Sequence, residues 1–304
     1  MKALLRVLGL VAAVSISAQM AHAAPKKILF FSKSSGYEHD RIKDKEHGGE
    51  MSDAGKILKK IGEENNIEFT FTKDGGVFTP ENIAKYDAFF FYTTEDLTTV
   101  GSDGNPPMSK EGKAAFLQAI HDGKGFIGTH SAADTFHSPG YHATAAERWS
   151  NDEKVDPYIQ MLGGEFIIHG SQQKAHLIVE DKSFPGMSAV PDDFARKEEW
   201  YSLKNFAPNL HVLLVQDTST MIKTANNKSA YDRPNYPSTW AHMYGQGRVF
   251  YTSMGHQEEI WTDPVFQQVL TGGIKWAIHD VDADVTPNLE QVAPQASTLP
   301  PPGK

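Results

Sequence analysis

The stretch that decides the fold is GFIGTHSAAD, residues 125–134, in which a short apolar run leads directly into a polar turn. An apolar run of this length, bounded by glycine and polar residues, is typical of a buried strand. The preceding segment, residues 109–122, carries Ala115, Phe116 and Ile120 at helical spacing and predicts an amphipathic helix. A helix followed by a buried strand indicates a βαβ unit and a parallel sheet.

The same alternation continues on both sides of this unit. Helices are predicted at residues 51–64, 79–85 and 264–276, with a capping residue and a proline at the start of the last two. Further strands are predicted at residues 28–31, 67–72, 88–92, 174–180, 212–215, 239–244 and 248–253. The sequence therefore predicts an α/β fold with a mostly parallel central sheet.

Residues 1–23 have the form of a secretory signal. A positive start and an apolar stretch at residues 8–18 precede a small-x-small cleavage site at residues 21–23. We therefore expect a cleaved signal peptide and a periplasmic or secreted protein. No later apolar run approaches the roughly 20 residues of a membrane span, so we expect no membrane contact after cleavage. One domain is predicted over residues 24–280, and a disordered Pro-rich tail over residues 281–304.

The composition narrows the classes of function. The formal net charge is −9 and no Lys/Arg cluster is visible, so we expect no nucleic-acid partner. The chain has no cysteine, which excludes disulfides, thiolate metal sites and a cysteine nucleophile. Any metal would have to be held by His, Asp or Glu. The sequence favours no particular oligomeric state.

Candidate site residues follow the predicted parallel strands. Ligands of open α/β sheets bind beyond the carboxyl ends of the strands, so side chains from distant parts of the sequence should meet there. Histidines and carboxylates are concentrated at these positions, although a single such histidine is more often an ordinary surface or core residue. The residues expected at this edge are Tyr37, His39, Thr94, His130, Asp134, His256 and Glu258.

Four motifs carry a family resemblance: FSKSSGYEH at 31–39, GFIGTHSAAD at 125–134, EEWY at 198–201 and GRVFYTSMGH at 247–256. Together they resemble the ThuA-like (trehalose-utilisation) family, and the resemblance runs from Lys27 to Ile278. It implies the class I glutamine amidotransferase-like fold, a flavodoxin-like three-layer sandwich. It also implies a small-molecule carbohydrate as partner, in catabolism of trehalose, another disaccharide or a 3-keto-glycoside.

The resemblance also implies what the site lacks. In amidotransferases the turn after the corresponding strand carries a nucleophilic cysteine, whereas here it carries His130; His256-Gln257-Glu258 resembles the activating His-x-Glu pair. An imidazole cannot form the thioester, so we expect no amidotransferase activity. The remaining groups suit proton transfer or a divalent metal such as zinc.

Residue roles are expected as follows. His130, Asp134, His256 and Glu199 are the catalytic candidates, and His130, His256 and Glu199 are also the candidate metal ligands, although no cofactor is certain. Glu199 could instead pair locally, and Trp200 could belong to the core rather than stack on a sugar. The substrate-binding candidates are Tyr37, His39, Thr94, His169, Trp200, His242 and Glu258.

Three functions stay open at this point. The chain could be a lyase, hydrolase or isomerase that acts on a modified sugar. It could be a carbohydrate-binding or accessory module without catalysis, or a metal-dependent hydrolase of another small polar substrate. The sharpest structural expectation is that His130 and His256 share one pocket, with Asp134 and Glu199 close enough to orient them.

Overall fold

The structure is a computed structural model that describes residues 24–44, 51–223 and 229–302. The predicted signal segment, residues 1–23, lies outside the described residues. None of the described helices is long and apolar enough to cross a lipid bilayer.

Five parallel strands form one half of the main sheet, and their order along the sheet is β2-β1-β3-β4-β11. This order matches the doubly wound flavodoxin-like arrangement, in which the ligand crevice opens where the winding reverses beside β1 and β3. The strands are β1 (Lys26–Phe31), β2 (Ile67–Thr72), β3 (Ala88–Phe91), β4 (Gly125–Thr129) and β11 (Gly247–Thr252). The mostly parallel α/β sandwich expected from the sequence is confirmed, with an antiparallel extension beyond β11.

The antiparallel extension continues the sheet in the order β10-β9-β6-β7. Its strands are β10 (Tyr236–Tyr244), β9 (His211–Gln216), β6 (Gln173–Val179) and β7 (Ala195–Glu198). A separate two-stranded sheet pairs β5 (Glu165–His169) with β8 (Tyr201–Lys204). The chain therefore passes from the main sheet to the small sheet at Glu199 and Trp200.

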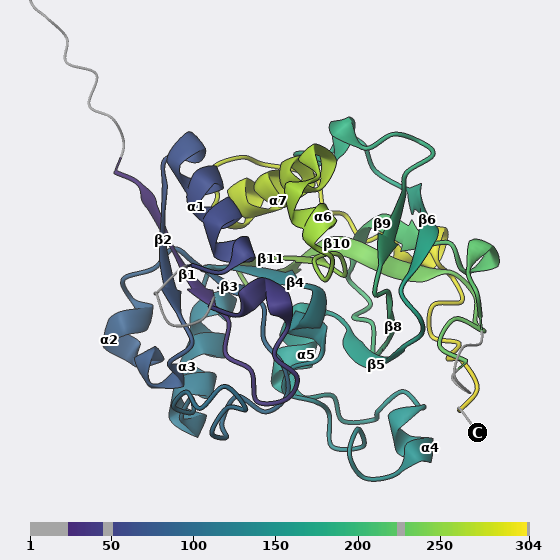
Figure 1. The fold of residues 1–304 in the computed structure, drawn as a ribbon, viewed down its shortest axis with the longest axis horizontal. Coiled ribbons are helices and arrows are strands. Elements are labelled where there is room, and N and C mark those ends of the chain that lie inside the picture. The colour runs from purple at the N-terminus through teal and green to yellow at the C-terminus, as the bar shows by residue number, and fades with distance from the viewer. Residues whose placement is uncertain (1–23, 45–50, 224–228, 303–304) are drawn as a thin grey trace, which may run out of the picture.

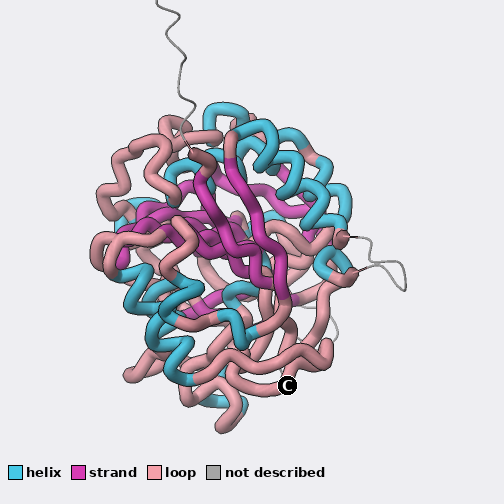
Figure 2. The backbone as a smooth tube through the Cα atoms, turned by 90° about the vertical axis from the view of Figure 1, so that its left-hand side faces the viewer, coloured by secondary structure: helices cyan, strands magenta, loops and turns pink. Residues whose placement is uncertain are grey.

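Helices cover both faces of the main sheet (Figures 1 and 2). One face carries α1 (Asp53–Asn65), α6 (Glu258–Thr262) and α7 (Pro264–Ala277). The other carries α2 (Pro80–Ile83), α3 (Lys110–His121) and α5 (Pro157–Leu162), while α4 (Ala145–Arg148) and α8 (Leu289–Val292) are single turns. Short 3₁₀ helices are η1 (Asp40–Ile42), η2 (Gly75–Val77), η3 (His130–Ala133), η4 (Met187–Ala189) and η5 (Thr218–Thr220).

Local sequence explains why these elements form. In β1, Ile28 and Phe30 enter the core under α1 and α7, whereas Leu29 and Phe31 enter the core under α3 and α5. Successive side chains of a strand point to opposite faces, so a continuous apolar run suits a sheet covered on both sides. Ser109 begins α3 by accepting a hydrogen bond from the Gly112 backbone N–H, which satisfies one of the free donors of the first turn.

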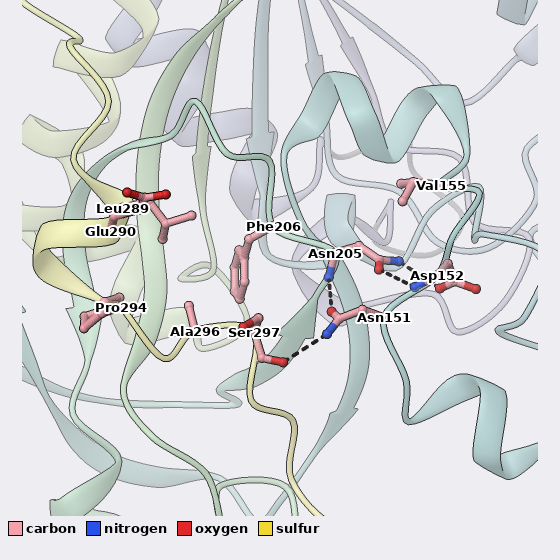
Figure 3. A pocket seen from close by; sticks show the side chains of 11 residues that line it. Asn151, Asp152, Val155, Asn205, Phe206, Leu289, Glu290, Pro294, Ala296 and Ser297 are labelled. Carbon is pink, nitrogen blue, oxygen red and sulfur yellow. Dashed lines mark hydrogen bonds between the residues drawn. The ribbon is translucent and has the colours of Figure 1, made fainter.

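The C-terminal segment differs from the sequence-based expectation of disorder. Residues 281–302 lie against the domain: Asn288 donates to and accepts from the backbone of Val212 through its side-chain amide, and its N–H donates to Leu210 O. Figure 3 shows Asn151 donating to the backbone oxygen of Ser297 beside a pocket. A polar, Pro-rich segment can still pack against the domain where side-chain amides form the hydrogen bonds that a helix or strand would form through its backbone.

We expect Asn288→Ala to lower the free energy of unfolding by about 1–3 kcal/mol, because the buried backbone groups of Val212 lose both partners. Gln291→Ala, an exposed position in the same segment, serves as the matched control and should change stability by less than about 0.5 kcal/mol. Urea unfolding of both variants measures the difference. Equal stabilities would show that the segment contributes nothing to folding.

Candidate functional site

Four side chains meet at the carboxyl edge of the parallel strands and form what we call the histidine centre: His39, His130, His256 and Glu199. One ligand atom from each lies within 4.8 Å of the others. His39 follows β1, His130 follows β4 and His256 follows β11, while Glu199 arrives from the crossing between the two sheets. The structure thus brings His130 and His256 together with Glu199, at a ring-centroid separation of 5.1 Å between the two histidines.

His130 is buried at a strained turn directly after β4. Its φ of 44° lies in the left-handed region, which non-glycine residues seldom adopt outside functional turns. Its Nδ1 lies 3.1 Å from the carbonyl oxygen of Ser253, which can only accept, so Nδ1 carries the proton. Nε2 is then left with its lone pair facing His256 Nδ1 at 3.3 Å and Glu199 Oε2 at 3.6 Å.

His256 pairs with a carboxylate on one side and an amide on the other. Its Nδ1 lies 3.3 Å from Glu199 Oε2, and its Nε2 lies 3.0 Å from the Gln172 amide nitrogen. Gln257 donates to Gln172 Oε1, which turns the Gln172 NH₂ group toward His256. In this arrangement Nδ1 carries the proton and Nε2 accepts. Burial lowers the pKa of His256, but the Glu199 carboxylate outweighs burial and raises the pKa above its ordinary value.

His39 completes the centre from the side of β1. Its side chain is buried, with 3% of the residue exposed, and its ring meets His130 and His256 edge-on at centroid distances of 4.8 and 5.3 Å. Within the described chain its Nδ1 is buried without a hydrogen-bond partner. Burial, reinforced by the charge that His130 and His256 can carry, holds the pKa of His39 well below its ordinary value. A neutral imidazole with a free nitrogen is therefore available here.

Glu199 faces three imidazoles. Oε2 lies between His130 and His256, and Oε1 lies 3.5 Å from His169 Nδ1. Burial alone would raise the pKa of Glu199, but the hydrogen bond from His256 and the positive charge that the neighbouring histidines can carry hold it well below its usual range. Glu199 is therefore an ionised carboxylate at neutral pH, and its charge offsets a proton or cation held by the surrounding histidines.

Glu198, which the sequence analysis did not place in the site, fixes the loop that carries His256. Its Oε1 accepts hydrogen bonds from the backbone N–H groups of Gly255 at 2.7 Å and His256 at 2.9 Å, and its Oε2 accepts from Glu199 N at 2.8 Å. The Tyr92 hydroxyl and the Trp261 indole both donate to Gly255 O. In the sequence, Glu198 stands out only as a second carboxylate beside Glu199 in the EEWY motif. Its position in the motif does not reveal which groups it binds.

The donor set of the histidine centre fits a divalent metal. Three imidazoles and one carboxylate are the ligands that zinc takes in proteins, and catalytic zinc sites use three protein ligands. The bond from His130 Nδ1 to Ser253 O is the outer contact that commonly fixes the tautomer of a ligating histidine. Among these three imidazoles, that of His39 has an Nδ1 that is buried without a hydrogen-bond partner within the described chain.

Two residues expected in the site belong elsewhere in the domain. Trp200 is fully buried and donates from its indole nitrogen to Gln173 O, so it is a core residue and no sugar platform. His242 lies opposite Val249, on the antiparallel strand β10. Because β10 runs against its neighbour β11, its C-terminal half lies at the edge of the sheet away from the histidine centre, where burial lowers the pKa of His242 to about 4.

Two expected carboxylates also lie apart from the centre. Asp134 contacts His137 Nε2 at 3.1 Å and accepts a hydrogen bond from the Tyr141 hydroxyl, because η3 turns it away from His130. Glu258, with a side chain 68% exposed, begins α6 and forms an ion pair with Arg41 at 3.0 Å. Neither carboxylate orients His130 or His256 in this structure.

The remaining expected residues border the centre. Tyr37 is 62% exposed, and its ring lies edge-on to His39. Thr94 Oγ1 donates to the backbone oxygen of Tyr37 and so fixes the loop after β1. His169 lies at the outer side of Glu199 and also lines a groove of about 620 Å³, which we call the side groove.

The side groove opens next to the histidine centre. Arg148 donates to Ile167 O at 2.8 Å and to the Tyr141 hydroxyl at 2.7 Å, which holds its guanidinium in the wall. Polar groups and aromatic rings alternate around this groove, the lining that small polar ligands use for orientation and contact. The lining includes Tyr141, Arg148, Trp149, Phe166, Ile168 and His169.

Comparison with known proteins agrees with this fold. No curated protein matches the chain. A ThuA-like protein from Bacteroides uniformis has a similar structure, with a TM-score of 0.60 and 18% identity over 88% of this chain and 95% of that one. One from Parabacteroides merdae has a TM-score of 0.55 and 19% identity, over 91% and 97% of the two chains. These likenesses show the fold. The family model described as ThuA, trehalose utilisation, matches residues 27–277, and the chain therefore belongs to the ThuA family.

Proposed function

We propose that this protein is an exported enzyme of carbohydrate catabolism that acts on an oxidised disaccharide or 3-keto-glycoside at the histidine centre. The observation that carries the proposal is the convergence of three imidazoles and an ionised carboxylate within 4.8 Å at the ligand-binding edge of the sheet. The family's trehalose-utilisation description and the polar, aromatic side groove beside His169 support a sugar as substrate. Export rests on the signal-like leader.

A keto group makes the neighbouring C–H acidic, and we propose that His256 takes this proton. The Nδ1–H of His256 points to Glu199, which leaves Nε2, beside Gln172, as the base. Nε2 takes the proton, and the C–H electron pair forms a C=C bond as the carbonyl oxygen becomes an enolate oxygen. Protonated His256 then returns the proton. In an elimination the enolate re-forms the carbonyl, its electron pair forms a C=C bond to the neighbouring carbon, the glycosidic C–O bond breaks, and the departing oxygen takes the proton. In an isomerisation the carbonyl re-forms as carbon takes the proton.

His39, His130 and Glu199 would hold a divalent metal behind this base. Such an ion, when bound, supplies a positive charge that polarises the substrate carbonyl. The residues themselves orient His256 and keep Glu199 ionised. The thioester route to glutamine hydrolysis is missing here, since the turn after β4 carries an imidazole and the chain has no cysteine.

The test incubates purified protein of known metal content with a 3-keto-disaccharide and with the unoxidised disaccharide, in D₂O, and follows both by NMR. We expect exchange or loss of the proton next to the keto group in the oxidised sugar, and no change in the plain one. The His256→Ala variant should bind the keto sugar without this reaction. Binding of either sugar without exchange would instead indicate a non-catalytic carbohydrate-binding module. Inert sugars alongside turnover of another ester or amide would indicate a metal-dependent hydrolase.

A further inference from the structure

We propose a second divalent-cation site, formed by Glu95, His137 and His142, which we call the outer cluster. One ligand atom from each of these residues lies within 4.8 Å of the others. Glu95 follows β3, and the two histidines lie in the segment between η3 and α4. The outer cluster shares no residue with the histidine centre, and the proposal does not depend on the reaction proposed above.

The orientation of His137 is the first argument. Its side chain is 3% exposed, and its Nδ1 lies 3.2 Å from Glu165 Oε1. Glu165 is fully buried and also accepts hydrogen bonds from Ser138 N and Ser138 Oγ, so its carboxylate is an acceptor held in place. A carboxylate can only accept from Nδ1–H, so Nε2 is the nitrogen that can take either a cation or a second proton. This carboxylate–histidine pairing is the outer contact that commonly orients a metal-ligating imidazole.

The surroundings of His137 Nε2 are the second argument. This atom is buried, has no geometrically sound hydrogen bond within the described chain, and faces Glu95 Oε2 at 3.9 Å and Asp134 Oδ1 at 3.1 Å. The same Glu95 oxygen lies 3.0 Å from His142 Nε2. Two imidazole nitrogens and the Glu95 carboxylate therefore lie around one point, with Asp134 beside His137, and this N/O set suits zinc or a similar divalent ion.

Backbone hydrogen bonds fix the positions of the residues that form the outer cluster. Glu95 has a φ of 61°, and this left-handed conformation is tied down because its N–H donates to Asp134 O at 2.5 Å and its carbonyl accepts from Phe136 N at 3.2 Å. A bridge between Glu95 and Thr135 joins the loops after β3 and β4. The nearby cation Lys113 is already neutralised by Asp156 at 2.8 Å. Lys113 therefore does not neutralise the carboxylate of the outer cluster.

A cation here would order one wall of the side groove. His142, whose side chain is 64% exposed, lines both the groove and a neighbouring cleft of about 400 Å³. Tyr141 stacks on the His137 ring at a centroid distance of 3.3 Å and accepts a hydrogen bond from Arg148. Binding at the outer cluster would thus hold Tyr141 and Arg148 in the positions from which they meet a ligand in the side groove.

The test measures metal stoichiometry. Protein stripped with chelator is titrated with Zn²⁺ by calorimetry, and with Co²⁺ while its visible absorption is recorded. We expect His142→Ala and Glu95→Gln each to bind one equivalent less than the wild type, and His256→Ala to keep that equivalent. His121→Ala, which removes a half-exposed histidine that belongs to neither cluster, is the matched control and should bind like the wild type.

The alternative is an imidazolium at His137, held by ion pairs to Asp134 and Glu165 without a metal. In that case wild type, His142→Ala and Glu95→Gln would bind equal amounts of Zn²⁺, and the proposal would be overturned. Loss of all binding in His256→Ala would overturn it as well. Because His142 is largely exposed, its replacement should leave folding intact, and circular dichroism checks this directly.

Discussion

Glu198→Ala should lower the free energy of unfolding by about 3 kcal/mol. The change removes the acceptor of four backbone N–H groups, those of Gly255, His256 and Glu199 and, at a longer distance of 3.4 Å, that of Gln257. Each buried donor left unsatisfied costs about 1–3 kcal/mol, and relief of the cost of burying the carboxylate offsets part of the sum. Denaturant unfolding followed by circular dichroism measures the difference.

Two variants make this result specific. Glu198→Gln keeps one carbonyl oxygen as an acceptor, so we expect a smaller loss of about 1 kcal/mol. Glu259→Ala removes an exposed carboxylate of α6 and should lie within about 0.5 kcal/mol of the wild type. If Glu198→Ala unfolded like Glu259→Ala, Glu198 would not hold the His256 loop.

His130→Gln should reduce turnover of a keto sugar by about 10²–10⁴-fold, the range typical of a lost acid–base or ligand group. Glutamine is polar and close in size to histidine, so we expect the fold and sugar binding to persist, although the amide does not occupy the position from which Nδ1 donates to Ser253 O. It lacks the imidazole Nε2 that faces His256 and Glu199, and with it a donor atom for a metal.

The measurement combines steady-state turnover with metal content of the purified variant. His121→Gln, a histidine at the end of α3, is the control and should retain full activity. Unchanged turnover in His130→Gln, with an intact fold, would place the chemistry outside the histidine centre. A loss of turnover without loss of metal would favour proton transfer by the imidazole over metal ligation.

The sequence by itself determined the layered part of the fold. Apolar runs such as Ala88–Phe91 and Gly125–Thr129 are continuous because both faces of a parallel strand are covered, and helices with capping residues alternate with them. The spacing of apolar residues is a property of each helix or strand, so it can be interpreted without knowing which elements pack against it. The rule that ligands bind at the carboxyl edge of such a sheet then predicted the neighbourhood of His130 and His256. The family motif containing Glu199 supplied the carboxylate.

Only the tertiary structure decided which side chains face one another. Asp134 follows the same strand as His130 but turns to His137, and His242 lies at the opposite edge because β10 runs antiparallel to β11. The spacing of apolar residues predicts neither the direction of a strand in the sheet nor the conformation of a loop. Glu198 is a related case, since its partners lie 57 and 58 residues away in the chain. Long-range hydrogen bonds and strand directions depend on how the whole chain packs, and periodicity within one element carries no information about them.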